Sequence, residues 1–363
     1  MTEPDQSLAG ERIDVVTVHL PQRHGRASER ALLAWVEGAR SLGADVRVAS
    51  WSSYEPREPL PAWCQHLGLP ERSARARHVA ALRHPRSDAR LLDWEPRPGA
   101  WAVADDVVSV AAVAGRDRSV MVAHYATLLD QWALRRAEPR HVQDLRHERR
   151  AAGMVRIPTA YSARVAQRFG HGSVPVPIAL EPAPAAPFVA EPVAVLPADW
   201  TWGPNLAALT VLLRQWPEVR AGAPGARLLL AGGGLPDAVR TSLPAGVEAL
   251  GHLPDVAELW AQAAVLAFPC PASSGPKVKV LEAAMAGVPV VTTRHGAEGL
   301  CLDAVTIASL DGFCGAVVKV LCDPATRADT AVRIRAGALA HHAPAPAATR
   351  RLTVWRDSLA RQD

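Results

Sequence analysis

The sequence predicts an α/β protein with two doubly wound domains in tandem, and three observations support this. The chain has 363 residues, enough for two domains of about 150 residues each. Short apolar segments typical of buried strands alternate with helical segments, first before residue 180 and again after residue 197. Between the two series, residues 181–197 contain five Pro, which is typical of a domain boundary. We therefore expect domains of residues 1–180 and 181–348, with a helix in residues 349–363 that returns to the first domain.

In the first domain, a helix capped at Ser28 lies between two predicted strands, and two further strands follow. Short strand–helix–strand connections predict a parallel sheet. These four strands are expected at Ile13–Leu20, Val46–Trp51, Val107–Ala114 and Ser119–His124, and two more at Arg156–Ala160 and Val174–Ile178. Asp105 and Asp106 then precede a strand instead of following one, so we expect structural roles for both and no metal binding. The irregular stretch Ser52–Gly99 is too long for a simple connection and is expected to select the substrate.

The second domain repeats the alternation with shorter connections. Its strands are expected at Arg227–Ala231, Val247–Leu250, Val265–Pro269 and Val288–Thr292, and its helices at Leu206–Leu213, Val256–Ala263 and Val278–Ala286.

Composition excludes several classes of protein. The apolar fraction is 49% and the net charge is +4, which excludes a mainly disordered chain and gives no indication of nucleic-acid binding. Five Cys without a Cys-x-x-Cys pair argue against a disulfide framework and against structural zinc. The sequence shows no signal peptide and no run of 18 apolar residues, so a cytoplasmic location is expected. The Arg-rich stretch 135–150 suits a solvated face or a weak contact with an anionic membrane surface.

The segment 268–291 carries the most informative chemistry. A buried strand ends at Pro269, and the loop Ser273, Ser274, Gly275 and Pro276 leads into a helix. Ligands of open α/β sheets bind at the carboxyl ends of strands, and helix N-termini attract anions. The chain has only three Lys, and two of them, Lys277 and Lys279, lie at this helix start. Glu282 lies about one turn further, where a carboxylate can accept hydrogen bonds from the vicinal hydroxyls of a ribose. The pattern predicts a site for a nucleoside diphosphate.

The same region resembles a known family. The segments Gly251-His-Leu-Pro-Asp-Val-Ala-Glu-Leu-Trp260, Ala263-Ala-Val-Leu-Ala-Phe-Pro269, Lys279-Val-Leu-Glu-Ala-Ala-Met-Ala-Gly-Val-Pro-Val-Val-Thr-Thr293 and Gly296-Ala-Glu-Gly-Leu300 are similar to the C-terminal domain of retaining glycosyltransferases of family 4, the glycosyl transferases group 1. The resemblance spans most of the chain and is specific in residues 250–300. It implies the GT-B fold, in which two Rossmann-like domains face a cleft, with a nucleotide sugar as co-substrate and no metal or other cofactor.

The resemblance also implies roles for individual residues. Glu282 matches the second of two family Glu residues separated by seven and would hold the donor ribose. Ser274 stands where the first would be, and a serine hydroxyl brings no negative charge. The basic pair usual near the start of this domain is absent, so Lys277 and Lys279 would neutralise the diphosphate. The remaining residues implied to bind the nucleotide are Val280, Leu281, His252, Leu253, Trp202 and Asn205.

In the first domain, His124 matches the family His that touches the donor sugar near the reacting carbon. The loop 21–27 contains Gly25, where backbone amides could meet phosphate or acceptor, although an ordinary strand–helix turn is an equal alternative.

Together these observations predict a metal-independent glycosyltransferase that moves a sugar from a nucleoside diphosphate such as UDP or GDP to a small-molecule acceptor. Retention of configuration is implied by the resemblance, and the Arg- and Ala-rich composition fits bacterial natural-product or glycoconjugate biosynthesis. The alternatives are a nucleotide-sugar epimerase or pseudo-glycosyltransferase on the same fold, and a non-catalytic nucleotide-sugar binder.

Overall fold

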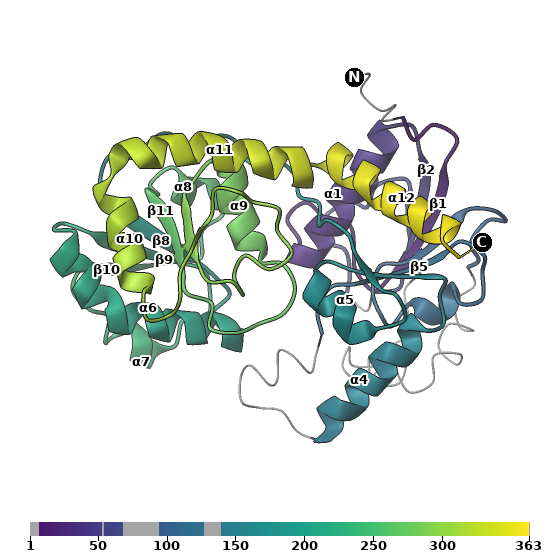
Figure 1. Ribbon diagram of the computed structural model, residues 1–363, viewed down its shortest axis with the longest axis horizontal. Coiled ribbons are helices and arrows are strands. Elements are labelled where there is room, and N and C mark those ends of the chain that lie inside the picture. Colours follow the sequence, from purple (N-terminus) through teal and green to yellow (C-terminus); the bar gives the residue numbers. More distant parts are fainter. Residues whose placement is uncertain (1–6, 53, 68–93, 127–138, 363) are drawn as a thin grey trace. The chain divides into compact units, whose positions relative to one another are not determined.

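The computed structural model describes residues 7–52, 54–67, 94–126 and 139–362, which form two compact units (Figure 1). The first unit contains residues up to Glu181 together with residues 342–362, and the second contains Pro182–His341. Part of the stretch Ser52–Gly99, residues 68–93, lies outside the described residues, as do residues 135–138 of the Arg-rich stretch. None of the described helices is both long enough and apolar enough to cross a membrane.

The described part of the first unit contains a seven-stranded parallel sheet in the order β3-β2-β1-β4-β5-β6-β7. Its strands are β1 (Arg12–Thr17), β2 (Asp45–Ser50), β3 (Cys64–His66), β4 (Trp101–Ala104), β5 (Ser119–Ala123), β6 (Ile157–Ala160) and β7 (Val174–Pro175). The core strands are buried on both faces, as parallel sheets require. The strand order reverses between β1 and β4, and ligands of such sheets bind at that switch point.

One predicted strand of this unit is wrong. Val107–Ala114 is a turn followed by the 3-10 helix η2 (Val110–Ala112), and the strand of the sheet is β4, earlier in the chain. The carboxylate of Asp106 explains the turn, because its Oδ1 accepts the backbone N–H of Ser109 at 2.6 Å and so bends the chain. Consequently Asp105 and Asp106 follow a strand instead of preceding one.

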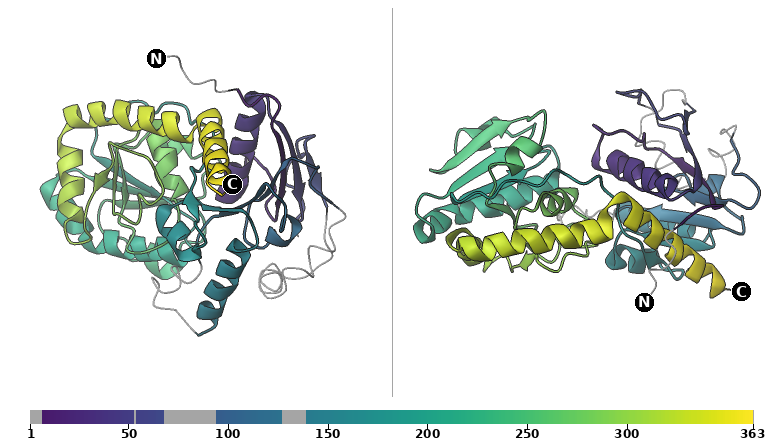
Figure 2. Two further views of the ribbon diagram at one scale, coloured as in Figure 1. Left: turned by 45° about the vertical axis from the view of Figure 1, so that its right-hand side comes forward. Right: turned by 90° about the horizontal axis from the view of Figure 1, so that it is seen from above.

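The helices of the first unit are α1 (Ala27–Ser41), α4 (Pro139–Ala152), α5 (Ala163–Phe169) and α12 (Pro344–Ala360). Helix α1 begins after Arg26, whose backbone N–H donates to Glu29 Oε2 at 2.6 Å, so Ser28 is not the cap. Helix α12 begins earlier than residue 349 and lies beside α1 in all views (Figures 1 and 2). The close packing requires Gly38, since a Cβ there would lie 2.2 Å from the carbonyl of Pro344.

The second unit has a six-stranded parallel sheet in the order β10-β9-β8-β11-β12-β13. Its strands are β8 (Val193–Pro197), β9 (Arg227–Ala231), β10 (Val247–Gly251), β11 (Val265–Phe268), β12 (Val290–Thr292) and β13 (Thr306–Ile307). Its helices are α6 (Gly203–Gly222), α7 (Asp237–Arg240), α8 (Ala257–Trp260), α9 (Val278–Ala286), α10 (Phe313–Cys322) and α11 (Pro324–His342). Both units therefore repeat the Rossmann strand order, and the predicted class of two doubly wound α/β domains is confirmed.

Candidate functional site

The second unit places Lys279 at the carboxyl edge of its sheet, on the first turn of α9. This helix begins after Lys277 and ends at Gly287, whose φ of 76° is the left-handed value that favours glycine. Lys279 Nζ donates to Asn205 Oδ1 at 2.7 Å and lies 4.6 Å from the centre of the Phe268 ring. Burial lowers the pKa of Lys279 to about 7. The charges of Glu282 and Asp199 offset this desolvation only in part, so an anionic ligand beside Lys279 would favour its charged form.

Asn205 is the residue that orients this ammonium. It lies in the first turn of α6, and its Nδ2 donates to the backbone carbonyl of Asp199 at 2.7 Å. Asp199 is the second residue after β8. Because the amide nitrogen is engaged there, the amide oxygen faces Lys279. Trp202, the residue before α6, is half exposed. The structure thus brings together Asn205 and Lys279, two of the residues that the sequence implied for the nucleotide.

The loop between β11 and α9 is stabilised by its own charged neighbours. Lys277 Nζ donates to the carbonyl of Ser274 at 2.9 Å and also to that of Gly275. The N–H of Gly275, a residue with φ of 69°, donates to Glu298 Oε1 at 3.1 Å. Ser273 and Ser274 are both buried. Lys277 therefore hydrogen-bonds to the backbone of this loop. We expect Lys279 to be the cation that contacts a ligand.

The other predicted nucleotide residues fall into two groups. Glu282 is half-buried on α9, and its charge acts on Lys279. His252 is exposed and Leu253 half-buried in the loop that follows β10. In contrast, Val280 and Leu281 are fully buried in α9. Their side chains belong to the core, so only their backbone could meet a ligand.

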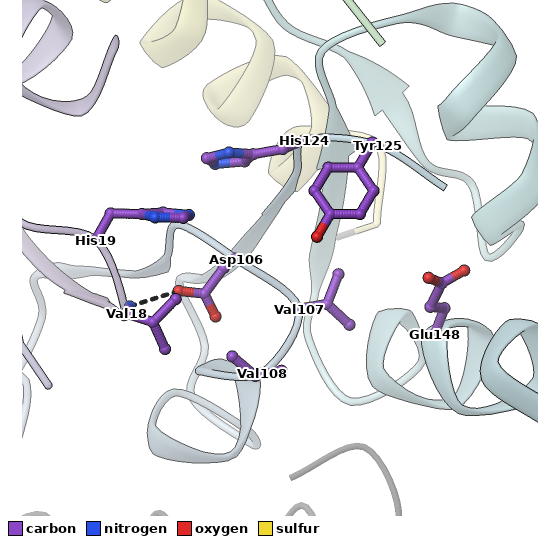
Figure 3. A pocket seen from close by; sticks show the side chains of 8 residues that line it. All are labelled: Val18, His19, Asp106, Val107, Val108, His124, Tyr125 and Glu148. Atoms are coloured by element: carbon purple, nitrogen blue, oxygen red, sulfur yellow. Dashed lines mark hydrogen bonds between the residues drawn. The ribbon is translucent and has the colours of Figure 1, made fainter. Parts of the chain in front are cut away.

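The first unit contains a cavity of about 80 Å³ at the carboxyl ends of its central strands (Figure 3). It is lined by Val18, His19, Asp106, Val107, Val108, His124, Tyr125 and Glu148. Residues 18 and 19 follow β1, residues 106–108 follow β4, and His124 follows β5. The cavity therefore lies where the strand order reverses, and the described residues supply no group of three metal-ligating side chains to it.

His124 is held between two other rings. Its ring stacks on that of His19 (Figure 3), and the ring centroids are 5.0 Å apart with 21° between the planes. The Tyr161 ring lies 4.9 Å away, and its hydroxyl accepts a hydrogen bond from Arg351 at 2.9 Å. His124 Nε2 lies 3.5 Å from Asp105 Oδ2. The predicted site residue His124 therefore comes with three partners that the sequence reasoning did not assign to the site.

The two neighbouring aspartates differ sharply in their surroundings. Asp106 accepts from the backbone N–H of Val18 at 2.8 Å and from the N–H and hydroxyl of Ser109 at 2.6 and 2.9 Å. It joins the ends of β1 and β4, so its predicted structural role is well supported. Asp105 is fully buried, and neither carboxylate oxygen has a hydrogen-bond partner among the described residues. In that part of the chain its carboxylate contacts the ring of His124.

His19 was also missed, because the sequence placed it inside a strand that ends at Thr17 in the structure. Its Nδ1 lies 3.2 Å from the hydroxyl of Ser28. The Ser28 hydroxyl therefore contacts His19 instead of capping a helix. Burial first, and the neighbouring His124 second, lower the pKa of His19 to about 4. The stack thus pairs His124 with a ring that stays neutral at physiological pH.

Gly25 has a local explanation. A Cβ at this position would lie 2.5 Å from Glu29 Oε2 and 3.1 Å from Gln22 Cβ, so the turn before α1 excludes a side chain. The same loop is held by Glu58, whose Oε1 accepts the backbone N–H groups of Arg23 and His24. These contacts favour the ordinary strand–helix turn over a phosphate loop.

Comparison with known proteins gives one family match and a set of structural matches. Residues 193–323 match the family described as glycosyl transferases group 1, and this segment runs from β8 to the end of α10 in the second unit. No curated protein shows significant sequence similarity to the chain.

Solved structures match both units. Sucrose-phosphate synthase from Thermosynechococcus elongatus matches with a TM-score of 0.68 and 13% identity, over 97% of this chain and 100% of that one. Anabaena HepE in complex with UDP and glucose matches with a TM-score of 0.62 and 13% identity, over 95% and 100%. The chain has the GT-B fold. TarM from S. aureus, at a TM-score of 0.56 and 10% identity, matches over 70% of this chain but 54% of its own, so this GT-B chain spans about half of TarM.

Proposed function

We propose that the protein is a glycosyltransferase that moves a sugar from a nucleoside diphosphate to an uncharged small-molecule acceptor, with retention of configuration and without a metal ion. The observation that carries this proposal is the desolvated Lys279, held by Asn205 at the sheet edge of a segment that matches glycosyl transferases group 1. The similar HepE structures, which are complexes with UDP and glucose and with UDP-glucose, support a nucleotide-sugar donor.

The donor binds to the second unit in this proposal. The diphosphate takes the place next to Lys279 Nζ and the first-turn amides of α9, where developing negative charge on the leaving group is stabilised most strongly in a dry site. Glu282 lies on the same face of α9 as Lys279, and its carboxylate accepts hydrogen bonds from the two hydroxyls of the ribose. No metal is needed for charge neutralisation, because a neighbouring ammonium supplies it.

The acceptor binds to the first unit, at the cavity of His19 and His124. The leaving phosphate oxygen takes the proton of the attacking hydroxyl, so the protein's task is to position the hydroxyl and the sugar. Asp106 and Glu148 line the cavity with carboxylates, which disfavours an anionic acceptor.

Binding of UDP, GDP and dTDP by calorimetry, with EDTA present, tests the donor half. We expect one of the three to bind to the wild type and to lose at least tenfold in affinity in Glu282→Ala. Glu218→Ala is the matched control, because it removes an exposed glutamate of α6 in the same unit. Failure of all three nucleotides to bind would refute the proposal.

A non-catalytic nucleotide-sugar binder is the second candidate, favoured by Ser274 where the family has a glutamate. Product analysis separates the two functions. Incubation with the nucleotide sugar that binds should release the nucleoside diphosphate by transfer or slow hydrolysis if the protein is an enzyme. An intact donor, after prolonged incubation with candidate acceptors, would favour the binder, and conversion of the sugar without an acceptor would indicate an epimerase.

A further inference from the structure

The Asp105 carboxylate is the least satisfied polar group at the cavity edge. It is 0% exposed, and both of its oxygens lack a hydrogen bond in the described part of the chain. The nearest partner atom is His124 Nε2 at 3.5 Å, which is equally buried and equally without a hydrogen bond. Buried polar groups are nearly always paired, so an unsatisfied pair of this kind requires an explanation. The fold does not supply one, because Asp106 alone makes the bonds that hold the loop.

We propose that Asp105 is a positioning residue that fixes the tautomer of His124, so that the ring presents Nδ1 as a hydrogen-bond acceptor for a substrate hydroxyl. An ionised carboxylate can only accept hydrogen bonds, so the ring nitrogen that faces it must carry the proton. In the neutral ring, a proton on Nε2 leaves Nδ1 with a free lone pair. The hydroxyl as ligand rests on the proposed function, whereas the tautomer does not.

The side chains around His124 hold its ring in place. The position of the proton on the ring is then the main property that can still vary. His19 covers one side of the ring and Tyr161 contacts it at a tilt of 48°. Both neighbours are themselves fixed, His19 by Ser28 and Tyr161 by the guanidinium of Arg351. A ring held by its neighbours at the rim of a cavity is pre-organised for binding, because little rotational freedom is lost when the ligand arrives.

The charges of the cavity select the ligand class. The carboxylates of Asp106 and Glu148, which line the same cavity as His124, disfavour phosphate or carboxylate groups, and an acceptor nitrogen favours a group that donates hydrogen bonds. His19 adds no positive charge, since burial holds its pKa at about 4. The chemistry that fits this edge of the first unit is therefore a neutral, hydroxyl-bearing molecule.

The first test is the tautomer itself, read on the full-length protein without substrate. Long-range ¹⁵N–¹H NMR spectra distinguish Nε2–H from Nδ1–H in neutral imidazoles, and His124→Gln identifies the signals of this ring. At a pH where titration shows the ring to be neutral, we expect Nε2–H in the wild type. In Asp105→Asn the preference should be lost or reversed, because an amide can donate to Nε2. Asp117→Asn, an exposed change in the same unit, should leave the spectrum unchanged.

Nδ1–H in the wild type, or an unchanged tautomer in Asp105→Asn, would overturn the proposal. If the variant fails to fold, the wild-type spectrum alone decides. Turnover provides the second test, with the nucleotide sugar that calorimetry selects. Asp105→Asn should lower kcat by about tenfold or more, as expected for loss of an oriented imidazole, with nucleoside diphosphate affinity unchanged within twofold. Unchanged kcat would overturn the role in positioning, whereas absence of nucleotide binding in the wild type refutes the proposed function and leaves the tautomer result standing.

Discussion

Replacing Lys279 by methionine should stabilise the protein and abolish nucleotide binding. Burial lowers the pKa of this ammonium from 10.5 to about 7, so the folded state holds it less favourably than the unfolded chain does. Because the folded-state pKa is the lower one, the cost is complete below pH 7, decreases as the pH rises, and is gone above 10.5. Methionine has similar length and no charge to desolvate. The variant should therefore gain most at low pH.

The magnitude follows from the two pKa values. At pH 7 the wild type loses about 4 kcal/mol of unfolding free energy through this group before solvent screening, and at pH 9.5 about 1.4 kcal/mol. The variant leaves Asn205 Oδ1 without the donor that lies 2.7 Å away, which costs about 1 kcal/mol at either pH. The net gain is about 3 kcal/mol at pH 7 and close to zero at pH 9.5.

Urea-induced unfolding at pH 7 and pH 9.5 measures both gains. Lys319→Met is the matched control, because it makes the same chemical change at an exposed position of α10. Its effect should be small and the same at both pH values. A variant that is destabilised at pH 7, or whose difference from the wild type is independent of pH, would refute the assignment of Lys279 as a desolvated cation. Calorimetry with the selected nucleoside diphosphate should show no binding.

Three further changes test the first unit. His19→Gln should reduce the loss of stability between pH 6.5 and pH 4, measured by thermal unfolding. In the wild type the unfolded chain binds a proton at this ring near pH 6.5, whereas the folded state does so only near its pKa of about 4. An equal loss in both proteins would contradict this. Gly38→Ala should lower stability by about 2 kcal/mol or more, since its Cβ would overlap the start of α12. Gly315→Ala, in open space on α10, is the control and should stabilise slightly. Asp106→Ala removes three hydrogen bonds and should lower the urea midpoint, and an unchanged midpoint would show that these bonds do not hold the loop.

The fold could be predicted because apolar segments of the right length alternate with helices throughout both halves. The error at β4 has a physical cause. Trp101–Ala104 is only four residues long and follows Pro98 and Gly99, whereas Val107–Ala114 is a longer apolar run. The hydrogen bonds from Ser109 to Asp106, and the backbone bonds that form η2, show that the second run turns. Apolar length is therefore a weaker guide to a strand than the polar groups at its ends.

That single error also hid the partner of His124. With β4 correctly placed, Asp105 is the residue directly after a central strand, where polar side chains meet at the switch point. His19 was missed for a similar reason, because its strand ends three residues earlier than expected. Lys279 could be found from sequence because lysine is rare in this chain, whereas its bond to Asn205 joins residues 74 positions apart and needed the structure.

In each unit, a charged group that lowers the stability of the fold lies at the corresponding place. Lys279 follows the central strands of the second sheet and Asp105 those of the first, and each is a charged group that burial destabilises or leaves unsatisfied. Among the described residues, the buried guanidinium of Arg351 has several partners, because it donates to the Pro177 carbonyl and the Tyr161 hydroxyl and lies over the Trp35 ring, although its Nη1 makes no hydrogen bond there. By comparison, neither oxygen of Asp105 has a hydrogen bond in the described part of the chain, and Lys279 donates to Asn205 in surroundings that lower its pKa. We therefore expect a ligand at each switch point to supply the contacts that the fold does not give to Asp105 and Lys279.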